Sequence, residues 1–334
     1  MSTWLEQLRY DPIAPLLGCK IDAVVYHTRR DLLGERVRPA RQLWSLTDVE
    51  KRLRKQQPNG AFFYPGKRVP VHPPHYYDLL ETWKQFRFLV DQYAMTKANP
   101  AVERAAEFLF SCQTSEGDIR GLLGNQYATY YTGAMTGLLI KAGYAKDTRV
   151  RKAFDWLLSM RQDDGGWTIP ILTLGLNKAE QARLFGADAE TLRGDQAKPF
   201  SHNWTGMILR AFAAHPQQRK SKAARTAARL LKTRFFKPDV YSSYQSPDYW
   251  VRFQYPFWWN HLVAAMDSIS RIAPHADDAD IQSALAWFAR NQQRDGLWRL
   301  SRERKKKARH AGANEMRCWI TLAICRIPKR YGMA

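Results

Sequence analysis

The sequence QDDGGW at residues 162–167 recurs in variant form as QQRDGLW at 292–298 and as QQPNGAF at 56–62. Each copy places a polar residue, a glycine and a large apolar residue at fixed distances, which is typical of a tight turn that returns the chain to a core. One copy departs from the others, because Gln162 stands one place late and Arg161 occupies the shared column. The turns therefore indicate an internal repeat.

An amphipathic helix is predicted before each turn. Three segments align without a gap when Val102, Val150 and Ile281 are placed under one another. Apolar residues follow four and seven places later, and an asparagine or aspartate that can cap a helix start stands three places earlier. Weaker copies are centred on Ser45 and Ala224, so the repeat is expected to run through most of the chain.

A second helical stretch, richer in aromatic and small residues, is predicted after each turn. Such helices are apolar nearly all round and must be covered by protein. Each repeat is therefore expected to be a hairpin of an amphipathic outer helix and a buried inner helix, and several hairpins can cover the inner helices by closing into a ring. The predicted inner helices are 75–93, 127–142, 202–214, 249–272 and 314–327.

The glycine-aromatic turns resemble the QW repeats of squalene cyclases and the related repeats of protein prenyltransferase β subunits. The resemblance implies an all-α fold, an (α/α) toroid of five to six helical hairpins of the terpenoid cyclase/protein prenyltransferase type. The whole sequence also resembles a stand-alone group within this prenyltransferase/squalene-cyclase-like family, through YHTRRDLLG at 26–34 and YWVRFQYPFWWNHLVAAM at 249–266. That resemblance implies no particular activity.

The predicted domain organisation is a single toroid domain spanning 1–334. Residues 1–44 are expected to form an N-terminal helical arm. The extra length at 170–199 is an insertion, either a lid or a surface loop, with a helix-like piece at 177–185.

The three familiar chemistries of this fold lack their motifs in the sequence. Neither the Asp-x-Asp-Asp acid of class II cyclases nor the Asp-Asp-x-x-Asp magnesium motif is present. The acidic run at 277–280 lies at a helix start, where negative charge favours the helix dipole. The Asp-x-Cys pair of zinc prenyltransferases is also missing. No metal or other cofactor is therefore predicted, and whether the protein is an enzyme stays open.

The candidate site is expected where the inner helices start, because these ends converge on one end of a toroid's central cavity. Aromatic walls with a few polar groups suit a mostly apolar ligand, and ring faces can also hold a cationic group. The predicted catalytic residues are His202, His75 and Glu315. The predicted ligand-binding residues are Tyr76, Tyr127, Tyr130, Trp204, Tyr255, Trp258, His261 and Arg317.

The charge balance is strongly basic, with 52 Lys+Arg against 31 Asp+Glu and a formal net charge of +21. Basic blocks lie at 219–234 and 299–309. Such a balance predicts attraction to polyanions. The start of the chain has no signal-peptide pattern, which favours the cytoplasm. The four cysteines are scattered, so a disulfide framework is not expected.

Three functions stay open. The leading hypothesis is a toroid that binds or converts an extended, mostly apolar, isoprenoid-like small molecule in an aromatic-lined central cavity, with a cyclase-like or transferase-like enzyme as the open catalytic alternative. The second is a non-catalytic binding protein whose basic surface contacts nucleic acid or an anionic membrane. The third is a lyase or hydrolase that acts on an acidic polysaccharide, by analogy with other helical toroids.

Overall fold

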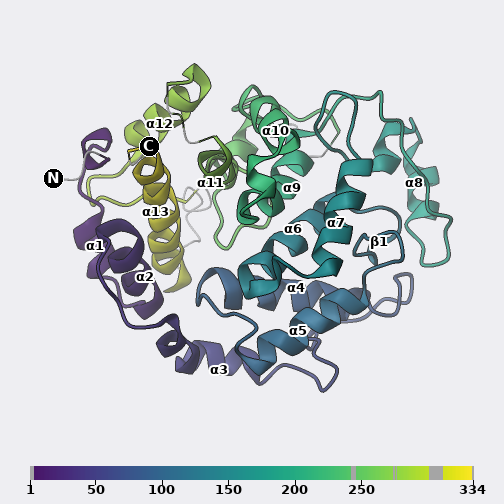
Figure 1. Ribbon diagram of the computed structural model, residues 1–334, viewed down its shortest axis with the longest axis horizontal. Helices are drawn as coiled ribbons and strands as arrows, with labels where there is room; N and C mark the ends of the chain where they lie inside the picture. Colours follow the sequence, from purple (N-terminus) through teal and green to yellow (C-terminus); the bar gives the residue numbers. More distant parts are fainter. Residues whose placement is uncertain (1–3, 242–245, 274, 276, 301–310, 333–334) are drawn as a thin grey trace. The chain divides into compact units, whose positions relative to one another are not determined.

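A computed structural model describes residues 4–241, 246–273, 275, 277–300 and 311–332 (Figure 1). Within these ranges the chain is predominantly helical, and its regular extended structure is the short strand β1 (Leu122–Asn125). The predicted all-α fold class is confirmed. The chain divides into two compact units: unit 1 joins Met1–Pro39 to Ala228–Ala334, and unit 2 is Ala40–Ala227. The single toroid domain stays a prediction.

Unit 2 alternates amphipathic outer helices with buried inner helices, as the repeat predicts. All residues of α6 are buried, whereas α5 and α7 each expose one face to solvent. The helices are α3 (Thr47–Leu53), α4 (Tyr76–Asp91), α5 (Pro100–Ser111), α6 (Thr129–Leu139), α7 (Thr148–Ser159), α8 (Lys178–Leu184) and α9 (His202–Ala214), and α10 (Lys222–Lys232) begins in this unit.

Unit 1 brings the two ends of the chain together. Its helices α1 and α2, from the start of the sequence, pack against α13 at the end, and α11 packs on α13 as well. No helix in the described ranges is long and apolar enough to cross a membrane. The helices are α1 (Ile13–Leu17), α2 (Asp22–His27), α11 (Leu262–Ile272), α12 (Ala279–Asn291) and α13 (Ala311–Tyr331).

The helix starts follow the capping residues that the sequence supplies. Asn99 and Asp147 accept hydrogen bonds from the backbone amides two residues on, at 2.9 and 2.8 Å, and Asp278 caps α12 in the same way. Such a bond satisfies an amide that has no partner within the helix. The predicted starts of these outer helices are therefore confirmed.

The predicted inner helix 249–272 is wrong in its first half. A short 3-10 turn at Pro247–Val251 is followed by non-helical chain, and α11 begins only at Leu262. Pro256 lies in the non-helical part, where its ring removes an amide donor and disfavours helical geometry in the residue before it. The apolar composition of this segment therefore reflects its burial and does not indicate a helix.

Two glycines allow the inner helices α6 and α9 to approach closely (Figure 1). A Cβ atom on Gly133 would lie 2.6 Å from the Cα of Ile208, and one on Gly137 would lie 3.2 Å from the amide nitrogen of Ala211. Both distances are shorter than ordinary carbon contacts. The backbones of these helices therefore pack almost directly against each other, which fixes the side chains at their starts.

Candidate functional site

The repeated glutamines link the end of one outer helix to the start of the next. Gln113 follows α5, and its Nε2 donates to the carbonyl oxygens of Gly117 (2.8 Å) and of Arg149 in the first turn of α7 (2.9 Å). Gln56 follows α3 and makes the equivalent bonds to its own turn and to Ala101 at the start of α5. One amide thus closes the turn and docks it on the neighbouring repeat.

The turn in unit 1 docks on the N-terminal segment instead of a further repeat. Gln292 Nε2 donates to the carbonyl oxygens of Gly296 (2.9 Å) and Tyr10 (2.8 Å). Its Oε1 accepts from the backbone amides of Arg9 and Tyr10, both at 3.0 Å. Residues near the start of the chain therefore occupy the place that the next outer helix takes in unit 2.

Gln162, which stands one place later than the repeat predicts, does not bond to its own turn through its side chain. Arg161 takes over the turn, since its guanidinium donates to the carbonyl oxygen of Gly165 at 3.1 and 3.2 Å. Gln162 is thereby released and donates to the carbonyl oxygens of Asp195 (2.9 Å) and Lys198 (2.8 Å). The shift of the glutamine by one position therefore lets its side chain hold the end of the insertion.

A threonine on each of the inner helices α4, α6, α9 and α13 completes a glycine turn, and no sequence pattern revealed it. The hydroxyl groups of Thr132 and Thr205 accept hydrogen bonds from the backbone amides of Ile119 (3.0 Å) and Trp167 (2.8 Å), respectively. Thr82 and Thr321 do the same in the other glycine turns, and all four threonines are fully buried. The varying distance between turn and threonine hid this signal.

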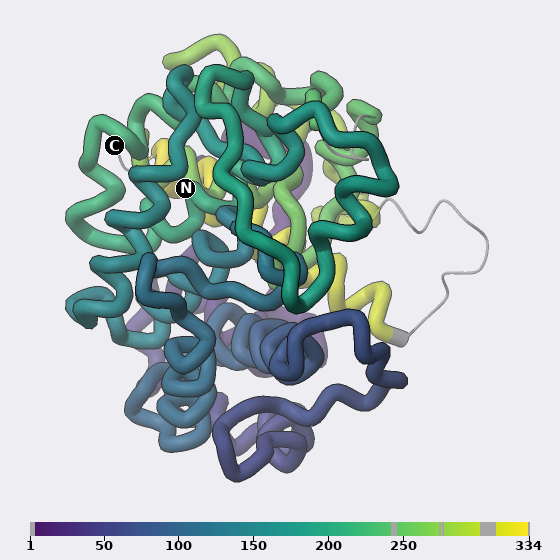
Figure 2. Tube along the Cα trace, turned by 90° about the vertical axis from the view of Figure 1, so that its right-hand side faces the viewer, coloured from purple at the N-terminus to yellow at the C-terminus, as the bar shows by residue number. Residues whose placement is uncertain are grey.

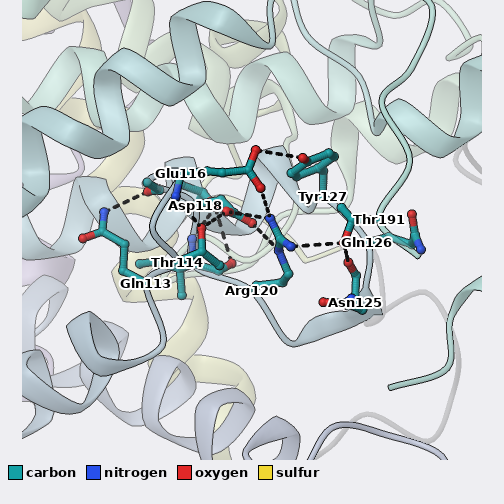
Figure 3. A network of polar contacts seen from close by, with 12 residues as sticks. Gln113, Thr114, Glu116, Asp118, Arg120, Asn125, Gln126, Tyr127 and Thr191 are labelled. Atoms are coloured by element: carbon teal, nitrogen blue, oxygen red, sulfur yellow. Dashed lines mark hydrogen bonds and ion pairs between the residues drawn. The ribbon is translucent and has the colours of Figure 1, made fainter. Parts of the chain in front are cut away.

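A polar network centred on Arg120 lies at the end of the glycine turn that follows α5 (Figure 3). Its guanidinium contacts the buried carboxylate of Asp118 at 2.9 and 3.0 Å and Glu116 at 3.0 Å. It also donates to the Thr191 hydroxyl at 3.1 Å and lies 4.8 Å from the ring centre of Tyr127. Burial opposes the charge, but the carboxylates outweigh it and raise the pKa of Arg120.

The insertion at 170–199, drawn as a teal-green tube in Figure 2, is held over the chain that leads into α6. Gln126 Nε2 donates to the carbonyl oxygens of Leu184 (3.0 Å) and Glu190 (2.7 Å), and its Oε1 accepts from the amide of Leu192 (3.1 Å). Asn125 donates to a further insertion carbonyl at 2.8 Å. The insertion is therefore fastened to the chain before α6, within unit 2, by the fully buried amide of Gln126.

Four aromatic rings from three inner helices of unit 2 form a continuous cluster. Trp83 of α4 meets Tyr131 at 4.9 Å, Tyr131 meets Tyr130 at 4.2 Å, and Tyr130 meets Trp204 of α9 at 4.5 Å between ring centres. The guanidinium of the buried Arg87 lies 5.6 Å from the Trp83 ring, and burial lowers its pKa to about 9. The cluster joins two predicted ligand-binding residues, Tyr130 and Trp204.

The predicted catalytic histidines of unit 2 stand at two helix starts. His75 precedes α4, and its Nε2 lies 3.1 Å from the carbonyl oxygen of Arg120. A carbonyl can only accept, so that nitrogen carries the proton. His202 is the first residue of α9, behind the Ser201 cap, and is 5% exposed. Their placement at helix starts agrees with the sequence, while a catalytic role stays a prediction.

Two predicted ligand-binding tyrosines of unit 2 already have polar or aromatic neighbours. Tyr76 stacks on His72 with ring centres 3.9 Å apart. The Tyr127 hydroxyl donates to Glu116 at 2.8 Å, next to Arg120. Burial, followed by the Glu116 carboxylate, raises the pKa of Tyr127. Tyr127 thus belongs to the Arg120 network.

In unit 1, three predicted ligand-binding residues lie at or before the start of α11, and one of them, His261, is its N-cap. His261 Nδ1 accepts from the amide of Ala264 at 3.3 Å, and its Nε2 lies 3.1 Å from the carbonyl oxygen of Gln254. Both ring nitrogens therefore make bonds that hold the helix start. Tyr255 is buried and Trp258 is half-buried, and both lie in the non-helical chain rather than at a helix start.

The remaining candidates lie near the beginning of α13. The side chain of Glu315 is exposed. Arg317 forms an ion pair with Asp295 at 2.6 Å and lies 3.4 Å from the carbonyl oxygen of Trp298. Arg317 thereby supports the glycine turn of unit 1. Among the described residues, no group of three or more His, Cys, Asp or Glu side chains could hold a metal ion.

The basic block 219–234 includes α10, and the block 299–309 lies largely outside the described residues. The exposed side chains of α10 are Lys222, Arg225 and Arg229, three and four residues apart. This spacing places them on one helix face. Ala224 and Leu231 are buried on the opposite face. The helix thus exposes a row of cations, and 216–238 contains no acidic residue.

Comparison with known families gives a match within unit 2. Residues 83–171 match the model of the squalene-hopene cyclase C-terminal domain. The chain contains a squalene-cyclase-like segment. It includes α5 to α7 and the turns that begin at Gln113 and Arg161. The resemblance inferred from the glycine turns is therefore confirmed.

Comparison with solved structures extends beyond the squalene-cyclase-like segment but adds no functional information. A crystal structure of a protein from Actinoplanes aligns with 96% of this chain and 88% of its own, at 16% identity and a TM-score of 0.47. No curated protein matches the sequence.

Proposed function

We propose that unit 2 binds an extended, mostly apolar, isoprenoid-like small molecule against the ring cluster of Trp83, Tyr131, Tyr130 and Trp204. The observation that carries this proposal is the contact of these rings across α4, α6 and α9. Contiguous aromatic faces offer a large apolar contact area at a small cost in side-chain entropy. The squalene-cyclase-like segment, which contains three of the four rings, supports the same class of ligand.

The charge beside the cluster argues for binding over cyclase chemistry. Cyclisation of an isoprenoid passes through carbocations, which aromatic faces stabilise and neighbouring cations destabilise. The buried Arg87 lies 5.6 Å from the Trp83 ring, and its charged neighbours are Asp91, which favours the guanidinium cation, and Arg210, which adds a second positive charge. A ligand with a neutral or anionic end group fits this environment better than a cationic intermediate.

Equilibrium binding of a fluorescent farnesol analogue tests the proposal. Tyr130→Ala and Trp204→Ala are each expected to weaken binding about tenfold, since the loss of an aromatic contact of about 1.4 kcal/mol has that effect. Trp204→Phe, which keeps an aromatic face, should restore most of the affinity. The control is Phe63→Ala, because Phe63 is 54% exposed in the same unit. Unchanged affinity in both alanine variants would refute the proposal.

A second candidate function rests on the basic face of α10. We propose that it contacts the phosphates of nucleic acid, because the exposed side chains of α10 are all basic and no apolar side chain of this helix is exposed for insertion into lipid. Arginine also suits the geometry of phosphate oxygens.

The salt dependence of DNA binding tests this second function. For a duplex oligonucleotide, the slope of log K against log salt is expected to become less steep by about 2 in the Lys222→Gln, Arg225→Gln double variant. Lys178→Gln changes an exposed lysine of α8 and serves as the control. Equal slopes in all proteins, or binding to anionic vesicles without binding to DNA, would exclude the proposal.

A further inference from the structure

The loop at 63–71, which follows the glycine turn after α3, exposes three large apolar side chains. Phe63, Val69 and Val71 are 54%, 47% and 55% exposed. The other exposed large apolar side chains of the described residues stand far apart in the sequence: Tyr10, Leu33, Leu158 and Val240. Single exposed apolar residues are ordinary, whereas a group of them marks a contact surface.

The three side chains are held in one part of the surface because the loop is anchored on Tyr77. The Tyr77 hydroxyl accepts a hydrogen bond from the amide of Val69 at 2.7 Å. The rings of Tyr64 and His72, each of which directly follows one of the other two exposed residues, lie 4.7 and 5.7 Å from the Tyr77 ring between centres. Each exposed side chain is therefore on, or next to, a residue that contacts Tyr77.

The conformation of the loop is also restricted. The amide of Phe63 donates to the carbonyl oxygen of Lys55 at 2.9 Å. A proline fixes one backbone angle and so reduces the number of conformations that a loop can adopt. Four prolines lie within the loop or just after it: Pro65, Pro70, Pro73 and Pro74. The loop therefore cannot easily turn its apolar side chains inward.

The chain around the loop is basic. Residues 51–77 contain six Lys or Arg and no Asp or Glu. Arg54, Lys55 and Lys67 are exposed, and in the described part of the chain no carboxylate forms an ion pair with any of the three. Lys67 lies within the loop, and Lys55 bonds to its first residue. Positive charge therefore surrounds the apolar side chains.

We propose that the 63–71 loop is a membrane-docking surface, which inserts its apolar side chains into an anionic lipid leaflet while the neighbouring cations contact the headgroups. Apolar side chains gain free energy when they leave water for the acyl region. Each lysine or arginine near an anionic leaflet adds electrostatic attraction. The loop combines both contributions.

Two other partners match the surface less well. Nucleic acid would satisfy the cations, but it offers no apolar phase to the two valines, and of the three exposed side chains only Phe63 has a ring that could stack on a base. A second copy of the chain would bring the same basic stretch and a net charge of +21, so like charges oppose self-association through this loop.

Co-sedimentation of the full chain with sucrose-loaded vesicles tests the proposal. The parent is expected to bind vesicles of phosphatidylcholine with one third phosphatidylglycerol about tenfold more tightly than vesicles of phosphatidylcholine alone. The Phe63→Ala, Val71→Ala double variant should bind the anionic vesicles about tenfold more weakly than the parent. Leu158→Ala changes an exposed apolar residue of α7 in the same unit and should bind as the parent does.

Charge variants separate the loop from the basic face of α10. The Lys55→Gln, Lys67→Gln double variant should weaken binding to anionic vesicles about tenfold. The Lys222→Gln, Arg225→Gln double variant removes the same charge from α10 and should weaken it by less than about threefold, because those side chains lie outside the docking surface. The reverse order of effects would contradict the proposal.

Hydrogen exchange locates the contact without any substitution. Anionic vesicles should slow amide exchange in a peptide covering 63–71 and leave a peptide covering α7 (Thr148–Ser159) unchanged. Equal vesicle binding by the parent and the Phe63→Ala, Val71→Ala variant, equal affinity for neutral and anionic vesicles, or protection at α10 without protection at 63–71 would each overturn the proposal. A dimer that requires Phe63, in a protein that binds no vesicles, would overturn it as well.

This membrane contact is separate from the apolar ligand proposed for the ring cluster. The Phe63→Ala, Val71→Ala variant should bind the farnesol analogue as the parent does, because neither residue belongs to the cluster. Loss of vesicle binding with intact ligand binding supports the docking surface. Loss of both in this variant would contradict the docking surface as a separate site.

Discussion

Replacing Gly60 with alanine is expected to lower the free energy of unfolding by about 3 kcal/mol or more, one of the largest effects of any single methyl group in this protein. Gly60 has φ +88°, and a Cβ there would lie 2.2 Å from the carbonyl oxygen and 2.7 Å from the carbonyl carbon of Arg104. Both atoms belong to the backbone of α5, so relief requires moving the helix on which the turn docks.

A matched control separates this contact from backbone conformation alone. Gly175, also in unit 2, has φ +67°, but a Cβ there would meet nothing within 4 Å. Gly175→Ala should therefore cost only the left-handed backbone penalty of about 1 kcal/mol. Urea unfolding of both variants measures the difference. Equal losses would mean that close docking of the turn is not what requires glycine at Gly60.

Asp31→Asn is expected to cost about 2 to 3 kcal/mol, because it removes the carboxylate from an ion pair between the N-terminal segment and α13. Arg326 Nε donates to Asp31 at 2.9 Å, and Arg30 Nε donates at 2.6 Å. The side chains of Arg326 and Asp31 are 14% and 21% exposed, so water can compensate only partly for the lost charge. Asp277→Asn, an exposed acid of the same unit, serves as the control.

The pH dependence of stability gives an independent check on this ion pair. Burial alone would raise the pKa of Asp31, but the charges of Arg326 and Arg30 outweigh burial and hold it well below its ordinary value. A depressed carboxyl pKa stabilises the fold above the unfolded value of about 4, and the contribution disappears as the pH falls further. The difference in Tm between the parent and Asp31→Asn should therefore narrow below about pH 4. A constant difference down to pH 2 would contradict this assignment.

The parts of the fold that were predicted correctly are those that depend on local sequence signals. The caps at Asn99, Asp147 and Asp278, the outer helices and the glycine turns depend on neighbours within a few residues, so their patterns survive in one sequence. Similarly, the helix-like piece of the insertion is α8, with a capping box between Asn177 and Glu180.

The missed features depend on partners far away in the sequence. Nothing beside Gln162 shows that it holds carbonyls of the insertion while Arg161 takes its place in the turn. The buried Thr205 accepts a hydrogen bond from the Trp167 amide, and the whole insertion separates these two residues in the sequence. Tertiary contacts of this kind leave no periodic signal.

The candidate site was predicted as a set of helix starts, and the structure divides that set. Tyr130 and Trp204 meet in the ring cluster, while Tyr127 joins the Arg120 network and His261 caps α11. Aromatic composition could indicate which residues are buried near inner helix starts. It could not distinguish a ring that faces other rings from one held by a carboxylate, because both are apolar positions in the sequence.

Native mass spectrometry of gently purified, nuclease-treated protein, followed by organic extraction, tests the proposed function most directly. An apolar species of a few hundred daltons is expected to remain bound to the parent and Phe63→Ala proteins and to be lost from Tyr130→Ala and Trp204→Ala. A parent protein that carries no such species, and takes up none when incubated with farnesol, would contradict the assignment of an apolar ligand to the ring cluster.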